Sequence, residues 1–187
     1  MIILISGKQG SGKTTLAQQL KASLGAKRVL HMKFADPLYQ IHNAMWNILE
    51  SYGIPREEKS GDFLQFVGTE WGRKRDPEIW VKIARTRAMR ALGDFEFVII
   101  DDCRFENEFD AFPEAFSIRL ECDREIRKAR AQGWREDETH PSEVGLDGYS
   151  TQNKFNLYLM TDSSAIESVV KVATKRVINE YNERCSS

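Results

Sequence analysis

The sequence is poor in cysteine and lacks a cysteine pair with metal-binding or redox spacing. Its three cysteines, Cys103, Cys122 and Cys185, are scattered along the second half of the chain. Disulfide-stapled domains and structural zinc sites need paired or closely spaced cysteines. We therefore expect reduced thiols in a cytoplasmic protein.

Long apolar runs, internal repeats and low-complexity segments are also missing. The apolar run at residues 1–5 is shorter than the core of a signal peptide, and no run reaches the length of a membrane span. The sequence shows no repeat of the kind that builds a solenoid. We expect a chain that does not associate with a membrane.

The sequence has little excess charge of either sign. It contains 27 basic and 28 acidic residues, which gives a net charge of −1. Because this balance does not demand a polyanion, we expect no direct binding to nucleic acid, whereas a small phosphorylated substrate needs only a local basic pocket. With 41% hydrophobic and 29% charged residues over 187 positions, the chain has the composition and length of one α/β domain.

Apolar strands and amphipathic helices alternate along the chain. This order predicts a mainly parallel sheet covered by helices on both faces. Strands are expected at residues 1–5, 29–34, 95–100, 116–122 and 155–160. Helices are expected at residues 13–24, 37–52, 77–92 and 123–132, and again from residue 166 to about 181. Residues 61–77 are expected to form a helix followed by a loop, and residues 133–150 to be irregular.

A phosphate-binding loop follows the first expected strand. Residues 7–14 read Gly-Lys-Gln-Gly-Ser-Gly-Lys-Thr and match the pattern GxxxxGK[ST] between a buried strand and a helix. Glycines allow backbone N–H groups to surround phosphates, the lysine reaches the β- and γ-phosphates, and the threonine hydroxyl binds Mg²⁺. We predict that ATP and Mg²⁺ are bound by Gly7, Gly10, Ser11, Gly12, Lys13, Thr14 and Thr15.

A carboxylate at the end of a neighbouring strand is the second requirement of such a site. Asp101 and Asp102 follow an apolar strand, and either could bind hydrated Mg²⁺. Because a buried parallel strand is apolar on both faces, alternation does not decide which of the two faces the metal.

The remaining motifs favour a kinase over a switch or a motor. Residues 153–156, Asn-Lys-Phe-Asn, lack the carboxylate with which GTPases select guanine, and motor ATPases are longer chains. Kinases of small phosphorylated substrates close a basic lid over the transferred group. The basic residues that could form this lid are Arg124, Arg127, Lys128, Arg130 and Arg135, of which Arg127 and Arg130 are our catalytic candidates. A solvated charged helix is the alternative interpretation of this cluster.

Several longer blocks resemble the bacteriophage deoxynucleoside monophosphate kinases, a branch of the P-loop nucleoside monophosphate kinases. Besides the loop at residues 7–14, the resemblance rests on Phe-Ala-Asp-Pro-Leu at 34–38 and Leu-Gln-Phe-Val-Gly-Thr-Glu-Trp-Gly-Arg at 64–73. It continues with Asp-Cys-Arg-Phe-Glu-Asn-Glu at 102–108 and His-Pro-Ser-Glu at 140–143. The blocks are in the family's order and span most of the chain.

The resemblance implies a P-loop fold with a five-stranded parallel sheet. It also implies an enzyme that phosphorylates deoxynucleoside monophosphates with ATP and Mg²⁺. Residues 1–187 would form one kinase domain, with a monophosphate-binding insertion at about 36–92 and a lid at about 123–143. Arg104 would hold a phosphate and take part in catalysis. The implied acceptor-site residues are Asp36, Gln65, Arg73, Trp80 and Arg104.

Two alternatives stay open at this point. The same scaffold serves kinases of other small metabolites, and a nucleotide-binding accessory protein of phage DNA metabolism would also need a P-loop. The base range, the preference for deoxyribose and the oligomeric state, including a homodimer, are not decided by the sequence.

Overall fold

The computed structural model describes residues 1–56, 61–131, 133–134, 136–162 and 166–186. Its centre is a five-stranded sheet in the order β2-β3-β1-β4-β5, and every neighbouring pair is parallel. The strands are β1 (Ile2–Gly7), β2 (Val29–Met32), β3 (Phe97–Cys103), β4 (Phe116–Glu121) and β5 (Leu157–Met160). This arrangement confirms the predicted fold class.

The first strand separates two hydrophobic cores. Ile3 and Ile5 belong to the core on one face of the sheet, and Ile2 and Leu4 belong to the core on the other face. Both sets are buried because successive side chains of a strand point to opposite faces. The continuous apolar run at the N-terminus is thus the pattern of a central parallel strand with both faces covered.

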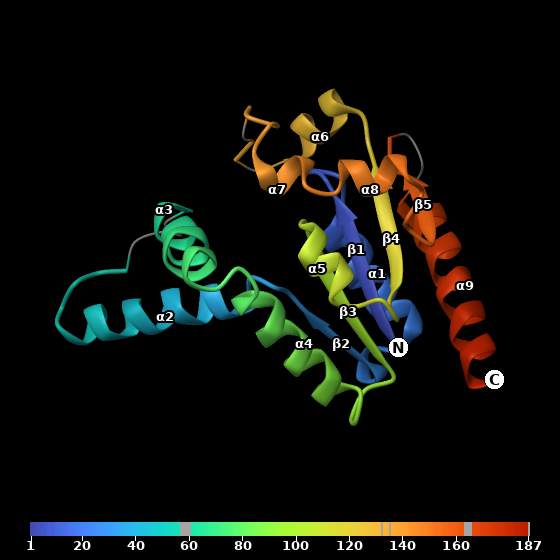
Figure 1. Cartoon of the computed structure of the whole chain (residues 1–187), viewed down its shortest axis with the longest axis horizontal. Helices are drawn as coiled ribbons and strands as arrows, with labels where there is room; N and C mark the ends of the chain where they lie inside the picture. The colour runs from blue at the N-terminus through green and yellow to red at the C-terminus, as the bar shows by residue number, and fades with distance from the viewer. Residues whose placement is uncertain (57–60, 132, 135, 163–165, 187) are drawn as a thin grey trace.

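Helices cover the two faces, as Figure 1 shows. α1 and α9 pack against the core that contains Ile3, while α4 and α8 contribute to the core that contains Leu4. The longer helices are α1 (Lys13–Leu24), α2 (Asp36–Ser51), α4 (Ile79–Ala91) and α9 (Ile166–Cys185). The shorter ones are η1 (Ala26–Arg28), α3 (Gly61–Gln65), α5 (Glu106–Asp110), α6 (Arg124–Arg130), α7 (Pro141–Val144) and α8 (Asp147–Thr151). No helix in these described ranges is both long and apolar enough to cross a membrane.

Two segments differ from the expectation. The chain after α3 does not become a loop but continues as a π-helix, η2 (Phe66–Arg73), in which Gly68 and Gly72 are buried. Residues 133–150 are not wholly irregular, because they include α7 and α8 and bury Leu146 and Tyr149. Helices of four or five residues are too short to show a helical period in the sequence.

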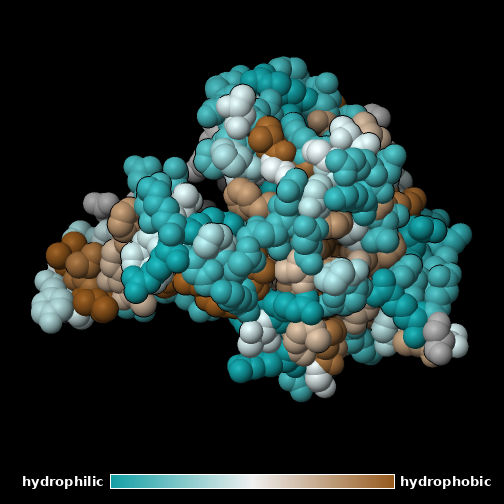
Figure 2. Space-filling model, in the orientation of Figure 1, coloured by the Kyte–Doolittle hydropathy of each residue, from teal (hydrophilic) through white to brown (hydrophobic). Residues whose placement is uncertain are grey.

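The elements α2, α3 and η2 project from the sheet as an insertion, seen in blue-green on the left of Figure 1. Figure 2 shows hydrophobic side chains gathered at the tip of this projection. Ile48 and Ile54, at the far end of α2 and just beyond it, are 59% and 48% exposed. The base of the insertion faces the carboxyl ends of the strands, where ligands bind in open α/β sheets.

Candidate active site

The loop at residues 7–14 joins the end of β1 to the start of α1 and is held against the segment predicted to be a lid. Gly10 has a φ of +76°, and a Cβ at this position would collide with the carbonyl oxygen of Arg127 in α6. Glycine is therefore required both by the backbone conformation and by the close approach of α6. The phosphate loop and α6 form one packed unit.

Lys13 is buried inside this loop. Its Nζ donates hydrogen bonds to the carbonyl oxygens of Gly7, at 2.6 Å, and Lys8, at 2.8 Å. Burial, assisted by the positive charge of Arg104, lowers the pKa of Lys13 to about 7. An anion bound in the loop would favour the charged amine. The Ser11 hydroxyl is also buried and has no hydrogen-bond partner within the described residues, so it fits a site that takes a polar ligand.

Asp101 and Asp102, the two candidate carboxylates, lie in different environments. The Asp101 carboxylate is buried, with His31 Nε2 3.1 Å from Oδ1 and Lys33 Nζ 3.7 Å from Oδ2. Burial would raise its pKa, but the neighbouring His31, Thr14 and Lys33 outweigh burial, and the pKa of Asp101 is lowered. Asp101 is therefore the carboxylate near the Thr14 hydroxyl, and these two groups have the chemistry to hold a hydrated Mg²⁺.

Asp102 lies in a different environment. Its two oxygens accept hydrogen bonds from the backbone N–H groups of Phe34 (2.8 Å) and Ala35 (3.1 Å), which fix the turn between β2 and α2. Removal of its carboxylate from water, together with the charge of Glu108, raises the pKa of Asp102 to about 7. The structure thus brings Asp101, and not Asp102, to Thr14.

A cavity of about 460 Å³ opens beside the phosphate loop and meets the insertion and the lid segment. Gln65, Arg73, Trp80 and Arg104, predicted as acceptor-site residues, all line it. The rest of its wall is formed by Gln9, Phe34, Ala35, Leu38, Tyr39, Gly61, Leu64, Gly68, Thr69, Asp102, Phe105, Glu108, Gly133, His140, Ser142 and Glu143. Residues distant in sequence therefore meet in one hollow next to the loop.

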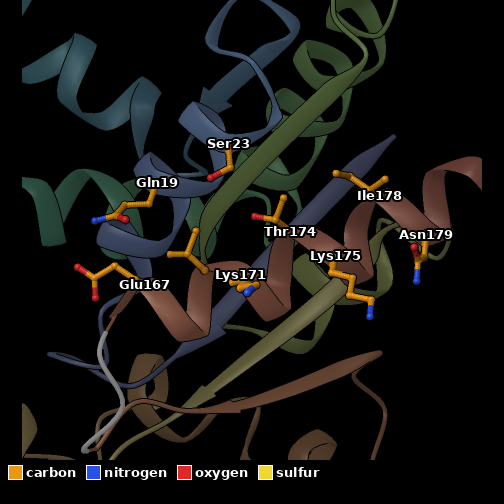
Figure 3. A pocket seen from close by; sticks show the side chains of 9 residues that line it. Gln19, Ser23, Glu167, Lys171, Thr174, Lys175, Ile178 and Asn179 are labelled. Atoms are coloured by element: carbon orange, nitrogen blue, oxygen red, sulfur yellow. The ribbon is translucent and has the colours of Figure 1, made fainter.

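A larger hollow, of about 620 Å³, lies between α1 and α9 (Figure 3). Its lining comes only from these two helices and includes Gln19, Lys171 and Lys175. It contains no residue of the phosphate loop. The smaller cavity, where charged groups converge on the loop, is therefore the candidate active site.

Two arginines enter this cavity, and each is paired with a carboxylate. Arg73 Nη2 lies 2.7 Å from Glu108 Oε1, and Arg104 Nη1 lies 2.7 Å from Glu143 Oε1. The second oxygen of Glu143 accepts a hydrogen bond of 2.7 Å from the backbone N–H of Gln9. A carboxylate thus connects the phosphate loop to Arg104, in a place where a phosphate oxygen could make the same bonds.

The basic lid segment is folded onto acidic residues of the same segment. Arg127 is 5% exposed and donates to the carbonyl oxygens of Gln9 and Cys122 and to the carboxylate of Glu138. Arg130 instead donates to the carbonyl oxygens of Thr161 and Asp162, which follow β5. Arg127 therefore lies against the phosphate loop, whereas Arg130 contacts the segment that follows β5. Arg135 lies outside the described residues.

The sequence matches a family model described as an AAA domain over residues 3–145. The chain belongs to the AAA domain family. No curated protein matches this AAA domain protein significantly. Among solved structures, it resembles TT1252 from Thermus thermophilus, with 21% identity, a TM-score of 0.58 and coverage of 96% of this chain and 97% of that chain.

Two kinases of known name share the fold of this AAA domain. Shikimate kinase from Aquifex aeolicus is 14% identical, with a TM-score of 0.53 and coverage of 96% of this chain and 98% of that one. Deoxyadenosine kinase from M. mycoides is 14% identical, with a TM-score of 0.51 and coverage of 96% and 100%. At these identities the likeness shows the fold alone, that of the P-loop kinases.

Two residues predicted for the acceptor site of the AAA domain have other contacts. Asp36 does not line the cavity, because its Oδ2 accepts from the backbone N–H of Lys33 (3.0 Å) and from Arg87 (3.1 Å) at the start of α2. Trp80 lines the cavity but is only 3% exposed, and its indole N–H donates to the Gly68 carbonyl oxygen at 2.8 Å. Trp80 therefore shapes the wall from inside the protein.

The two carboxylates that pair with the cavity arginines were not predicted from the sequence. Glu108 and Glu143 are both inside blocks that carry the family resemblance, yet neither was assigned a role. Glu108 contacts the backbone N–H of Arg104, four residues before it, but its contact with Arg73 spans 35 positions. A contact of that range leaves no local signal.

The packing of Trp80 predicts a large effect on stability at Gly72. A Cβ at Gly72 would lie 2.5 Å from Cζ2 of the Trp80 ring, so we expect Gly72→Ala to destabilise the fold by about 1–3 kcal/mol through overpacking. Urea unfolding measures this difference. Gly148→Ala is the control, because a Cβ there meets nothing within 4 Å, and equal stability of the two variants would contradict the packing argument.

Proposed function

We propose that this protein phosphorylates deoxynucleoside monophosphates, with ATP as the phosphoryl donor. The observation that carries the proposal is the presence of Arg73 and Arg104 in one cavity beside the phosphate loop. A guanidinium is suited to bidentate contact with phosphate, so two of them favour an acceptor that already carries a phosphate. A hydroxyl acceptor that carries neither a phosphate nor a carboxylate has no need of this pair.

The donor side of the site would bind ATP through the loop. Backbone N–H groups of residues 7–14 and the N-terminus of α1 would surround the β-phosphate, and Lys13 would move from the loop carbonyls to the β- and γ-phosphates. Thr14 and Asp101 would hold Mg²⁺, which supplies charge neutralisation on the β- and γ-phosphates when bound. Thr14 lies near enough to Asp101 to help lower the pKa of its carboxyl, which supports this role.

The acceptor side of the site would orient the monophosphate and would not react with it covalently. The phosphate of a monophosphate is already ionised, so no general base is needed, and the rate depends on alignment and on neutralisation of charge. Arg73 and Arg104 would hold the acceptor phosphate, while Leu38, Leu64 and Gln65 would face the nucleoside. The structurally similar deoxyadenosine kinase has been described with its products, dCMP and a flexible dCDP, bound, so this scaffold accommodates nucleotides of that kind.

A panel of acceptors tests the proposal. ADP release is measured with ATP and each deoxynucleoside monophosphate, with the matching ribonucleotides, and with each deoxynucleoside that lacks the phosphate. We expect at least one deoxynucleoside monophosphate to accelerate ADP release, and we expect its unphosphorylated counterpart to fail because it cannot engage the two arginines.

The same panel separates the alternatives. Shikimate, gluconate and dephospho-coenzyme A represent other acceptors of P-loop kinases, and turnover of one of these alone would overturn the assignment. Slow hydrolysis that no small acceptor stimulates, but that DNA does, would instead indicate a nucleotide-binding accessory protein.

A further inference from the structure

Three arginines near the phosphate loop each contact a carboxylate, and the three carboxylates are not equivalent. The pairs are Arg73–Glu108, Arg104–Glu143 and Arg127–Glu138. The side chain of Glu108 is 2% exposed, against 10% for Glu143 and 23% for Glu138. Glu108 is therefore the carboxylate that the fold has withdrawn most completely from water.

Glu108 uses both of its oxygens. Oε2 accepts hydrogen bonds from the backbone N–H groups of Arg104 (2.8 Å) and Phe105 (3.2 Å), at the turn between β3 and α5. Oε1 accepts from Arg73 Nη2 at 2.7 Å, across 35 positions of sequence. One side chain thus joins the insertion to the turn that carries Arg104.

A capping role accounts for the backbone contacts but not for the contact with Arg73. Glu108 is in the first turn of α5 and reaches back to the N-cap backbone of Phe105, as in a capping box. The contact with Arg73 adds nothing to that cap. An exposed carboxylate would cap the helix as well, without the desolvation that burial imposes.

Arg73 is restrained from a second direction. Its guanidinium carbon lies 4.2 Å from the centre of the Phe105 ring, in the same turn whose backbone N–H groups are bound by Glu108. The side chain of Arg73 is 24% exposed and lines the cavity, so the restrained group still faces the space where an acceptor would bind. Restraint of a long side chain before binding reduces the entropy lost on binding.

Resting on the proposed function, we propose that Glu108 is a positioning residue, which fixes Arg73 and the Arg104 turn in one geometry for the acceptor phosphate. Burial raises the pKa of Glu108, while the Arg104 N–H and Arg73 oppose this shift, in keeping with a carboxylate whose ionised form depends on its partners. The glutamate itself need not touch the substrate.

Glu108→Gln tests the proposal by kinetics. An amide offers one acceptor oxygen, so its NH₂ group must face either Arg73 or the backbone N–H groups, and one link is lost. We expect the KM for the monophosphate to rise by about tenfold or more, the effect of losing one charged hydrogen bond, while the KM for ATP changes by less than about twofold. Glu106→Gln is the matched control, because it removes a carboxylate from an exposed position of the same helical turn.

A double-mutant cycle distinguishes positioning from capping. If Glu108 acts through Arg73, Glu108→Gln has little further effect on the KM of Arg73→Ala, and Glu108→Asp restores part of the wild-type value. A residue that only caps α5 gives additive effects, lowers the melting temperature and leaves the two KM values in their original ratio. That second pattern would overturn the proposal.

Side-chain NMR decides the same point without any acceptor. The Nε–Hε group of Arg73 is expected to be ordered in the wild type and mobile on the nanosecond timescale in Glu108→Gln. Equal order in both proteins would overturn the positioning role. If the wild type phosphorylates no deoxynucleoside monophosphate, the proposed function fails, and this measurement still decides the role of Glu108.

Discussion

Lys13→Ala is expected to lower kcat by about 10³-fold or more and to leave the fold intact, in line with the removal of a charge-stabilising group from phosphoryl transfer. The fold should survive because Lys13 Nζ contacts the carbonyl oxygens of Gly7 and Lys8 within its own loop. Backbone N–H groups of the loop remain in the variant, so weakened binding of ATP should persist. Steady-state ADP release and thermal unfolding measure the two expectations.

Lys21→Ala is a suitable control, because it removes a lysine from the same helix at a position that is not part of the phosphate loop. It should retain wild-type kcat. A folded Lys13→Ala protein with wild-type turnover would remove the phosphate loop from the mechanism. A variant that does not fold would show that Lys13 is held in the loop for stability.

The fold could be predicted because its determinants are local. The apolar run of β1, the glycine-rich loop after it and the helical period of α1 lie within 24 residues, and each agrees with the others. The same agreement extends to β3, whose apolar residues precede Asp101. Local patterns that are mutually consistent were enough to place the loop, the strand end and the parallel sheet.

Candidate site residues could be named from the sequence only where they belong to a recognisable motif. Arg73 and Arg104 are within distinctive blocks, and the structure brings both into one cavity. The choice between Asp101 and Asp102 needed the position of Thr14 in space, which alternation along a strand does not contain. The contact of Asp36 with Arg87, 51 positions away, carries no local signal either.

A phosphate bound at the loop in the proposed way would exchange places with a carboxylate. The backbone N–H of Gln9 donates to Glu143, and the same carboxylate holds Arg104. A phosphate that takes these two donors has to replace Glu143. Glu143 is in α7 of the lid segment, so the proposed function predicts that phosphate binding displaces this segment through one carboxylate.

Arg127 and Arg130 are expected to differ sharply, although the sequence offers them as equal candidates for catalysis. Arg127 contacts the Gln9 carbonyl oxygen of the phosphate loop, whereas Arg130 contacts the carbonyl oxygens of Thr161 and Asp162. We expect Arg127→Ala to lower kcat and kcat/KM together by about 10²–10³-fold, as for an interaction made mainly in the transition state. Arg130→Ala should keep kcat within a few-fold of wild type.

The measurement is steady-state kinetics of both single variants and the double variant, with ATP and the best monophosphate. Lys21→Ala again serves as the control, because Lys21 is in α1 and outside both the phosphate loop and the lid segment. Because Arg127 is buried, thermal unfolding of each variant must show that the protein is folded before its rate is compared. If the folded double variant keeps its kcat, the segment is a charged helix that packs on the loop without acting on the transferred group. Arg104, which pairs with Glu143 and lines the cavity, would then be the next arginine to test.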